Sequence, residues 1–293
     1  MKLTLPKKKR YLLRIITPAY PAFNIYSFVA DKTTAVGPLY VATSAKKVPG
    51  WDIEVIDENN LRRFGPKDPY RGADHNFLQQ QRPADVVGFY GGLTSTIPRI
   101  YELARFYKSQ GTITIAGGQH FVEETIPEGL DSGLDCVVRG EGEEAIKELL
   151  KAFVSDGDLS KILGIAYHDH SSIVHTPTRP PIQNLDNIPS PDFSLLRYAK
   201  LLLYPINRVR GCGMDCEFCA VKGKARFSSP EKTLEQMSKL IETFGAKEFF
   251  VVDDLFGQDR NETIRFCRMY KAVSYTHLTL PTNRVAGGSR GGR

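Results

Sequence analysis

The chain has 293 residues, of which 41% are hydrophobic and 25% are charged. This is the composition of a globular protein with length for about two domains of ~150 residues, and it excludes a wholly disordered or collagen-like chain. No apolar run approaches the ~18 residues that a membrane helix needs, and the apolar stretch after the basic start is too short for a signal peptide. We therefore expect a cytoplasmic protein with no membrane span.

The formal net charge of +6 comes from 39 basic and 33 acidic residues. Half of it lies in the last 21 residues, which contain Arg284, Arg290 and Arg293 and no acidic residue. Without that segment the balance is ordinary, and the sequence does not indicate the dense basic surface that binds nucleic acid. We expect no nucleic-acid partner.

Strand-like and helix-like segments alternate through the first half of the chain. Apolar runs predict strands at 11–17, 52–57, 85–90, 112–116 and 135–138, and helical spacing predicts helices at 37–47, 97–109 and 141–153, with a short helix near Phe77. Repeated βα units predict an α/β fold with a doubly wound parallel sheet. Ligands bind such sheets beyond the carboxyl ends of the strands.

Glycines gather where the predicted strands end. Gly91 and Gly92, Gly117 and Gly118, and Gly140 follow three of them, and glycine lets a large ligand approach the backbone closely. None of these segments fits the GxGxxG pattern, so a nicotinamide or flavin site is not indicated. Taken alone, these glycines are better explained as tight turns.

Proline marks a boundary after residue 160. Residues 163–169 and 172–175 are predicted to form a small hairpin, and the prolines between 177 and 191 are typical of an interdomain linker. We expect one domain at 1–160, a hairpin and linker at 161–200, and the start of a second domain at 201–272.

The five cysteines are an odd number, which makes a poor disulfide framework. Cys212, Cys216 and Cys219 have the spacing Cys-x3-Cys-x2-Cys after a predicted strand at 204–210. Three thiolates on one loop can bind three irons of a 4Fe–4S cluster and leave the fourth iron open. A structural zinc site or a ferredoxin-type electron carrier would need a fourth ligand nearby. A non-catalytic iron–sulfur or zinc-binding module nevertheless remains the alternative to an enzyme.

The segment Arg210-Gly211-Cys212-x3-Cys216-x-Phe218-Cys219 resembles the signature of radical S-adenosylmethionine enzymes. The surrounding chain is similar to the subgroup with an N-terminal cobalamin-binding domain, through matches at 84–88, 117–120, 138–143, 184–189 and 226–231. This resemblance covers roughly residues 10–270. It implies a flavodoxin-like cobalamin-binding domain followed by the first βα units of a TIM-type radical barrel.

The resemblance also implies an activity. A 4Fe–4S cluster would cleave S-adenosylmethionine to a 5′-deoxyadenosyl radical in a cobalamin-dependent enzyme. Methylation of an unactivated carbon is the leading reaction, and radical cyclisation or rearrangement with the same cofactors is the alternative. The expected partners are a small-molecule substrate and an electron donor such as flavodoxin or ferredoxin.

Particular residues acquire roles only through this resemblance. Cys212, Cys216 and Cys219 would hold the cluster, and Phe218 would pack beside it or beside the adenine. A strand at 248–252 ends at Asp253 and Asp254, which would lie near the amino group of S-adenosylmethionine. The cobalamin-binding candidates are Gly91, Gly92, Thr94, Gly117, Gly118, Gly140 and Glu141. No Asp-x-His-x-x-Gly motif, whose His would bind cobalt, follows the first strand. His120 is a weak alternative cobalt ligand. Catalytic residues are not assigned.

Residues 273–293 differ from the rest. They follow a predicted helix at 260–272 abruptly, and 273–282 resembles translated transposase-adapter DNA. We expect a non-native tail after about Ala272, a C-terminally truncated barrel, and therefore a fragment that is inactive alone.

Overall fold

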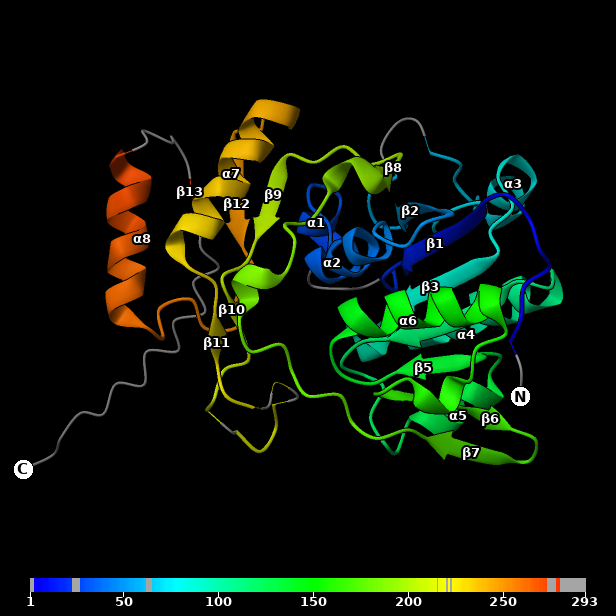
Figure 1. Ribbon diagram of the computed structural model, residues 1–293. Helices are drawn as coiled ribbons and strands as arrows, with labels where there is room; N and C mark the ends of the chain where they lie inside the picture. The colour runs from blue at the N-terminus through cyan, green and yellow to red at the C-terminus, as the bar shows by residue number, and fades with distance from the viewer. Residues whose placement is uncertain are drawn as a thin grey trace, which may run out of the picture.

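A computed structural model describes residues 3–22, 27–61, 65–214, 216–219, 221, 223–272 and 278–279. A larger α/β body is flanked by a smaller layer of two helices on a short sheet (Figure 1). The predicted tail lies outside the described residues except for Leu278 and Thr279, so its origin stays a prediction.

The larger sheet has eight strands among the described residues, in the order β7-β6-β5-β4-β3-β1-β2-β8. Their bounds are β1 (Tyr11–Thr17), β2 (Trp51–Asp57), β3 (Val86–Tyr90), β4 (Ile113–Gly117), β5 (Cys136–Val138), β6 (Ile165–Asp169), β7 (Ser172–His175) and β8 (Leu196–Arg197). The first five strands pair in parallel in the order 2-1-3-4-5. This is the flavodoxin-like order, so the predicted doubly wound sheet is confirmed.

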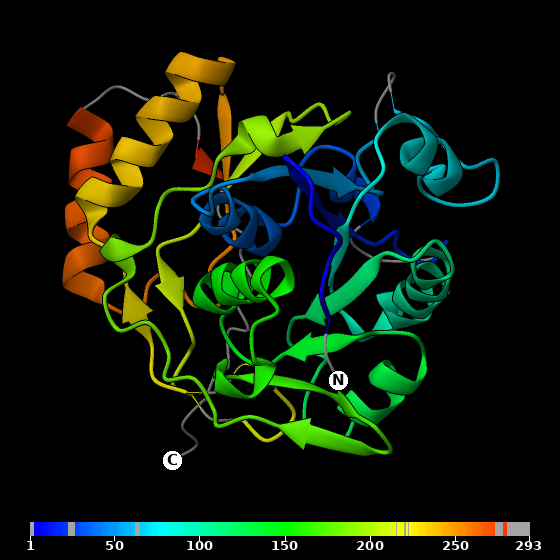
Figure 2. The same ribbon diagram turned by 45° about the vertical axis from the view of Figure 1, so that its right-hand side comes forward.

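Helices cover both faces of this sheet (Figure 2). They are α1 (Ser27–Ala30), α2 (Val36–Ala45), α3 (His75–Gln81), α4 (Ile97–Ser109), α5 (Ile126–Asp131) and α6 (Gly142–Ser155). The central strand β1 alternates between two cores: Leu13 contributes to the core that contains residues of α2 and α6, whereas Leu12 contributes to the core that contains residues of α3, α4 and α5. Burial on both faces explains why β1 is an almost continuous apolar run.

Arg14 is the exception in that run, and its side chain is completely buried. Its Nε donates to Oε1 of Glu54 at 2.7 Å, and its Nη2 donates to the carbonyl oxygens of Leu78 and Arg82. A buried charge is tolerated when it is paired and hydrogen-bonded. Arg14 therefore ties the end of α3 to the centre of the sheet.

The segment predicted as hairpin and linker adds to the larger sheet at both edges. Strand β6 pairs antiparallel with β5, and β7 continues the same edge. Strand β8 pairs with β2 at the opposite edge. The proposed domain boundaries stay a prediction, but residues 161–200 take part in the first fold unit rather than only connecting it.

The smaller sheet is parallel, with the order β13-β12-β9. It comprises β9 (Leu203–Ile206), β12 (Glu248–Val251) and β13 (Leu278–Thr279), with α7 (Pro230–Phe244) and α8 (Arg260–Ala272) as its helices. The α7 helix starts at a Ser229 cap, whose side chain accepts from the Lys232 N–H. These βα units are those expected at the start of a barrel.

The predicted strand at 204–210 is wrong in its extent. Strand β9 ends at Ile206, and β10 (Val209–Arg210) leaves it to pair antiparallel with β11 (Arg226–Phe227). The backbone N–H groups of Arg208 and Val209 donate to Oδ1 of Asp253 at 2.7 and 2.9 Å. The chain turns there because a carboxylate at the end of β12 takes the backbone groups that a continuing strand would use.

No helix in the described part of the chain combines the length and apolar character required to cross a membrane.

Candidate functional site

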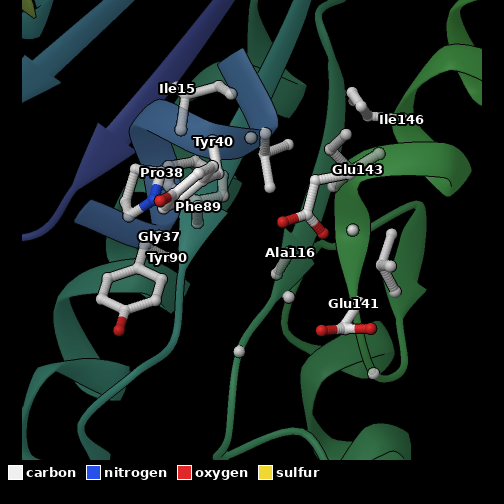
Figure 3. Close-up of a pocket in the computed structure, with 18 of the residues that line it drawn as sticks. Ile15, Gly37, Pro38, Tyr40, Phe89, Tyr90, Ala116, Glu141, Glu143 and Ile146 are labelled. Atoms are coloured by element: carbon white, nitrogen blue, oxygen red, sulfur yellow. The ribbon is translucent and has the colours of Figure 1, made fainter. Parts of the chain in front are cut away.

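A cavity of about 240 Å³ lies at the carboxyl ends of β3, β4 and β5, between α2 and α6 (Figure 3). Its lining is mainly apolar side chains and glycine backbone. The lining glycines are Gly37, Gly88, Gly117, Gly118, Gly140 and Gly142. Backbone without side chains lets a flat organic group lie directly against the chain.

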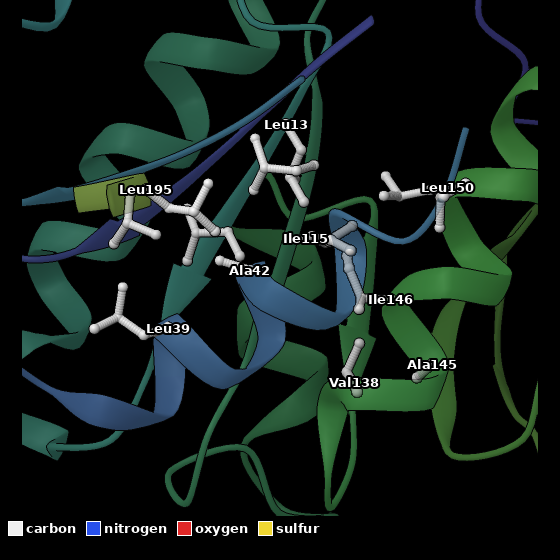
Figure 4. Close-up of a cluster of buried hydrophobic side chains, with 14 of the residues drawn as sticks. Leu13, Leu39, Ala42, Ile115, Val138, Ala145, Ile146, Leu150 and Leu195 are labelled. Carbon is white, nitrogen blue, oxygen red and sulfur yellow. The ribbon is translucent and has the colours of Figure 1, made fainter. Parts of the chain in front are cut away.

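The floor of the cavity belongs to a closely packed core. Ile115 and Ile146 line the cavity and also pack with Leu13, Leu39 and Ala42 beneath it (Figure 4). Such interiors are packed as densely as organic crystals. The cavity therefore has a rigid base.

The predicted glycines divide into two groups. Gly117, Gly118 and Gly140 line the cavity, as does Glu141, whereas Gly91 and Gly92 do not. Thr94 is also absent from the lining. Assignment of all of these residues to cobalamin stays a prediction.

Gly91 contacts two of the glycines that line the cavity, Gly117 and Gly118. Its N–H donates to the carbonyl of Gly117 at 2.7 Å, and a Cβ on Gly118 would lie 2.6 Å from the Gly91 backbone. Gly118 also has a φ of 124°, which side chains rarely adopt. These glycines are tight turns, as their local sequence suggests, and they also shape the cavity edge.

Charged groups form the rim of the cavity. The Arg210 guanidinium lies 4.9 Å from the centre of the Tyr40 ring and donates to Glu141 at 2.8 Å and to Glu143 at 2.6 Å. The Tyr40 hydroxyl donates to Oδ1 of Asn207 at 2.9 Å, and burial raises the pKa of Tyr40. The rim thus joins the larger sheet to the segment that leads into the cysteine loop.

Glu141 is strongly engaged in this rim. Burial opposes ionisation of its carboxyl, but hydrogen bonds from Arg226, Arg210 and the Ile182 N–H outweigh burial and hold its pKa below the usual range. The carboxylate is therefore occupied by protein partners, and it contributes to the cavity mainly as a wall.

The three cysteines lie on the loop between β10 and β11. Each is partly exposed and none forms a disulfide. Among the described residues, no three Cys, His, Asp or Glu side chains converge on a metal-sized site. The donor chemistry nevertheless fits an iron–sulfur cluster, because three soft thiols that form no disulfide lie within one short loop. Their ligand role stays a prediction.

Two other predicted side chains have distinct surroundings. Phe218, between two of the cysteines, is 94% exposed, so in this structure it packs against no neighbour that would bury it. His120 contacts Thr94, with 3.3 Å between Nδ1 and Oγ1, and it is not among the residues that line the cavity.

Asp253 uses one oxygen to fix the turn into β10. Its Oδ2 is buried and has no hydrogen-bond partner within the described residues. Burial raises the pKa of Asp253 to about 6, against the opposing effect of the two backbone donors. Asp254 is exposed. An unpartnered carboxylate oxygen is suited to accept from an ammonium group.

Sequence reasoning assigned no binding role to Tyr40, Asn207 or Glu143. Glu143 lies within the matched segment 138–143, so that match is the one signal that could have identified it. Tyr40 faces the cavity from a helix, and Asn207 reaches it from 167 residues further along the chain. No local pattern in the sequence brings those two together.

Comparison with known proteins agrees with this architecture. Residues 28–150 match the B12 binding domain. The chain is 34% identical, over 86% of its length, to an uncharacterized methyltransferase from Pyrococcus horikoshii. Over 62% of its length it is 30% identical to an anaerobic magnesium-protoporphyrin IX monomethyl ester cyclase from Rubrivivax gelatinosus.

A solved structure shares the fold. The radical S-adenosylmethionine methyltransferase TsrM from Kitasatospora setae superposes with a TM-score of 0.65 at 19% identity, covering 88% of this chain and 50% of that one. This chain spans 55% of the Pyrococcus protein and 36% of the Rubrivivax protein. Most residues that line the cavity lie within the matched B12 domain, and Ile15, Asn207 and Arg210 line it from outside the match. The chain therefore contains a B12-binding domain and shares its fold with a radical S-adenosylmethionine methyltransferase.

Proposed function

We propose that this chain binds cobalamin at the cavity and a 4Fe–4S cluster with S-adenosylmethionine at the cysteine loop, as part of an enzyme that methylates an unactivated carbon. One observation carries the proposal: Arg210 lines the cavity and is also the residue from which the cysteine loop departs. If the cavity and the loop hold the two cofactors, their sites would be adjacent.

The cavity suits one end of cobalamin. Its volume of about 240 Å³ lies below the ~300–1,000 Å³ of a pocket that encloses a drug-sized ligand. The nucleotide tail fits a small, mainly apolar pocket with glycine walls, and the corrin would then lie outside it. The glycine turns at Gly117 and Gly140 keep the backbone accessible to the cofactor, and the packed floor excludes water.

The cysteine loop would supply three thiolate ligands. Cys212, Cys216 and Cys219 leave one iron without a protein ligand, which suits the amino and carboxylate groups of S-adenosylmethionine. When bound, these cofactors supply the electron that generates the 5′-deoxyadenosyl radical and the methyl group that is transferred. The buried Oδ2 of Asp253, which has no partner among the described residues, would accept from the ammonium of S-adenosylmethionine.

Radical cyclisation is the second candidate, because the Rubrivivax relative bears a cyclase name. It uses the same cofactor sites, so identifying the product of the whole protein would separate the two reactions. A small-molecule substrate and a flavodoxin or ferredoxin as electron donor are part of the proposal in either case.

The test is anaerobic reconstitution of the 293-residue chain. We expect about four irons per chain, an EPR signal of the reduced cluster that changes when S-adenosylmethionine is added, and a corrin absorption that persists through gel filtration. Replacing Cys212, Cys216 or Cys219 with Ala should abolish the cluster. Cys267→Ala is the matched control, since Cys267 is an exposed cysteine outside the loop.

Each part of the proposal can fail separately. An EPR signal that does not respond to S-adenosylmethionine would contradict the open iron, and stoichiometric zinc in place of iron would favour the structural module. Loss of the corrin absorption on gel filtration would remove cobalamin from the proposal.

A further inference from the structure

Both ends of the cysteine loop are bound to a single carboxylate of the larger α/β body. Arg210 ends β10 before the loop, and Arg226 begins β11 after it. Nη1 of Arg210 lies 2.8 Å from Oε1 of Glu141, and Nη1 of Arg226 lies 3.0 and 2.9 Å from its two oxygens. Glu141 immediately precedes helix α6.

Further hydrogen bonds and partial burial stabilise this arrangement. Oε2 of Glu141 also accepts from the Ile182 N–H at 2.6 Å, and Nη1 of Arg226 donates to the Ile182 carbonyl at 2.6 Å. The side chains of Glu141, Arg210 and Arg226 are only 17–18% exposed. Partly buried, charge-assisted hydrogen bonds are stronger and more directional than ion pairs on an open surface.

The same carboxylate belongs to the cavity. Glu141 and Arg210 both line it, and the positive end of the α6 dipole favours a negative charge at this position. A displacement of Glu141 would therefore move the cavity wall and the base of the loop together.

We propose that Glu141 is a positioning residue that holds the cysteine loop in register with the cavity. This rests on the proposed function only for the identity of what the loop and the cavity bind. Without the carboxylate charge, Arg210 keeps Glu143 as a partner, whereas Arg226 keeps, among the described residues, only the Ile182 carbonyl. The β11 end of the loop is thus the end that loosens first.

The first experiment uses the metal-free and cobalamin-free 293-residue chain. In Glu141→Gln we expect amide exchange of Gly213, of β10–β11 and of Ser228 to become at least about tenfold faster, because a charge-assisted bond is lost. Exchange in β4 and α4 should not change. Glu144→Gln is the matched control, since Glu144 lies on the same helix and pairs only with Lys147 among the ion pairs of the described residues.

A second measurement separates positioning from general stability. After iron and sulfide reconstitution, a chelator should bleach the iron–sulfur absorption at least about fivefold faster in Glu141→Gln than in Glu144→Gln. Arg226→Lys keeps a positive charge facing Glu141. Its rate of bleaching should lie between the rates of Arg226→Met and of the unaltered chain.

Two results would overturn the inference: equal loop exchange in Glu141→Gln and Glu144→Gln, or a uniform rise that includes β4 and α4. The proposed function can fail independently. If the chain retains no corrin and no iron but the loop exchange responds as expected, the positioning role of Glu141 stands and the cofactor assignment falls.

Discussion

The two oxygens of Asp253 have different surroundings. Oδ1 accepts from two backbone N–H groups and fixes the turn between β9 and β10, whereas Oδ2 is buried without a partner among the described residues. One oxygen therefore has a structural role, and the other is available to a ligand. A substitution that keeps the first and alters the second can separate these roles.

Asp253→Asn should be at least as stable as the unaltered chain at pH 7.5, yet bind S-adenosylmethionine at least about tenfold more weakly. Burial raises the pKa of Asp253 from 3.8 to about 6, so the folded chain binds this proton more tightly than the unfolded chain does. Its contribution to stability is full below pH ~4 and is lost as the pH rises through 6. Urea unfolding at several pH values and ligand titration of the reconstituted chain would measure both effects.

Two further variants serve as controls for that prediction. Asp253→Ala removes the acceptor of two backbone donors and should cost about 2 kcal/mol of unfolding free energy. Asp254→Asn alters the exposed neighbour. If Asp254→Asn weakens binding and Asp253→Asn does not, the ammonium site belongs to Asp254.

At the scale of elements, the turns after β3 and β4 depend on each other. Gly118→Ala would place a Cβ 2.6 Å from the backbone of Gly91 at a φ of 124°. We expect a loss of about 3 kcal/mol in the unfolding free energy, measured by urea denaturation, since neither backbone can move aside cheaply.

Gly140→Ala provides the comparison for that variant. Gly140 also has a positive φ, of 80°, but a Cβ there would meet nothing within 4 Å. Gly140→Ala should lower the unfolding free energy by only about 1 kcal/mol, because it incurs the conformational penalty alone. Equal costs at Gly118 and Gly140 would mean that the contact between the two turns is not a determinant of stability.

The accuracy of the sequence-based elements follows from how local their causes are. The strand at 11–17 and the helix at 97–109 are predicted with the bounds observed, because a continuous apolar run and a 3.6-residue spacing are contained in the segments themselves. Helix α5 was not predicted, since its six residues include Pro127 and Gly129 and show no usable period. The end of β9 could not be read locally, because Asp253 determines it from 45 residues away.

The candidate site likewise has features that the sequence predicts and features that depend on residues far apart in the chain. Topology alone places the turns at Gly117 and Gly140 beside the cavity, because carboxyl ends of parallel strands meet at one edge. The contacts of Glu141 bring Arg210 and Arg226 onto it from 69 and 85 residues away. Such long-range pairing leaves no periodic signal in the sequence.

At the scale of the whole molecule, the cavity lies between the carboxyl edge of the larger sheet and the start of the cysteine loop. Its walls come from α2, α6 and the strand ends, while Asn207 and Arg210 reach it from the segment around β10. The site therefore depends on the larger sheet and the loop segment being folded together. Filling the cavity from one wall tests whether this junction is where cobalamin binds.

Gly37→Leu should abolish retention of cobalamin while leaving the fold intact. Gly37 lies in the first turn of α2, and a Cβ there would make an ordinary 3.5 Å contact with the Tyr90 ring, so the added side chain would occupy the cavity. The unfolding free energy should change by less than about 1 kcal/mol, because Leu is a better helix former than Gly. Corrin absorption after gel filtration should fall at least about tenfold, whereas Lys47→Leu, at an exposed position just beyond the same helix, should retain it. If Gly37→Leu retained cobalamin as well as the unaltered chain does, the tail of the cofactor would have to lie outside this cavity, and the glycine turns would have to be explained by folding alone.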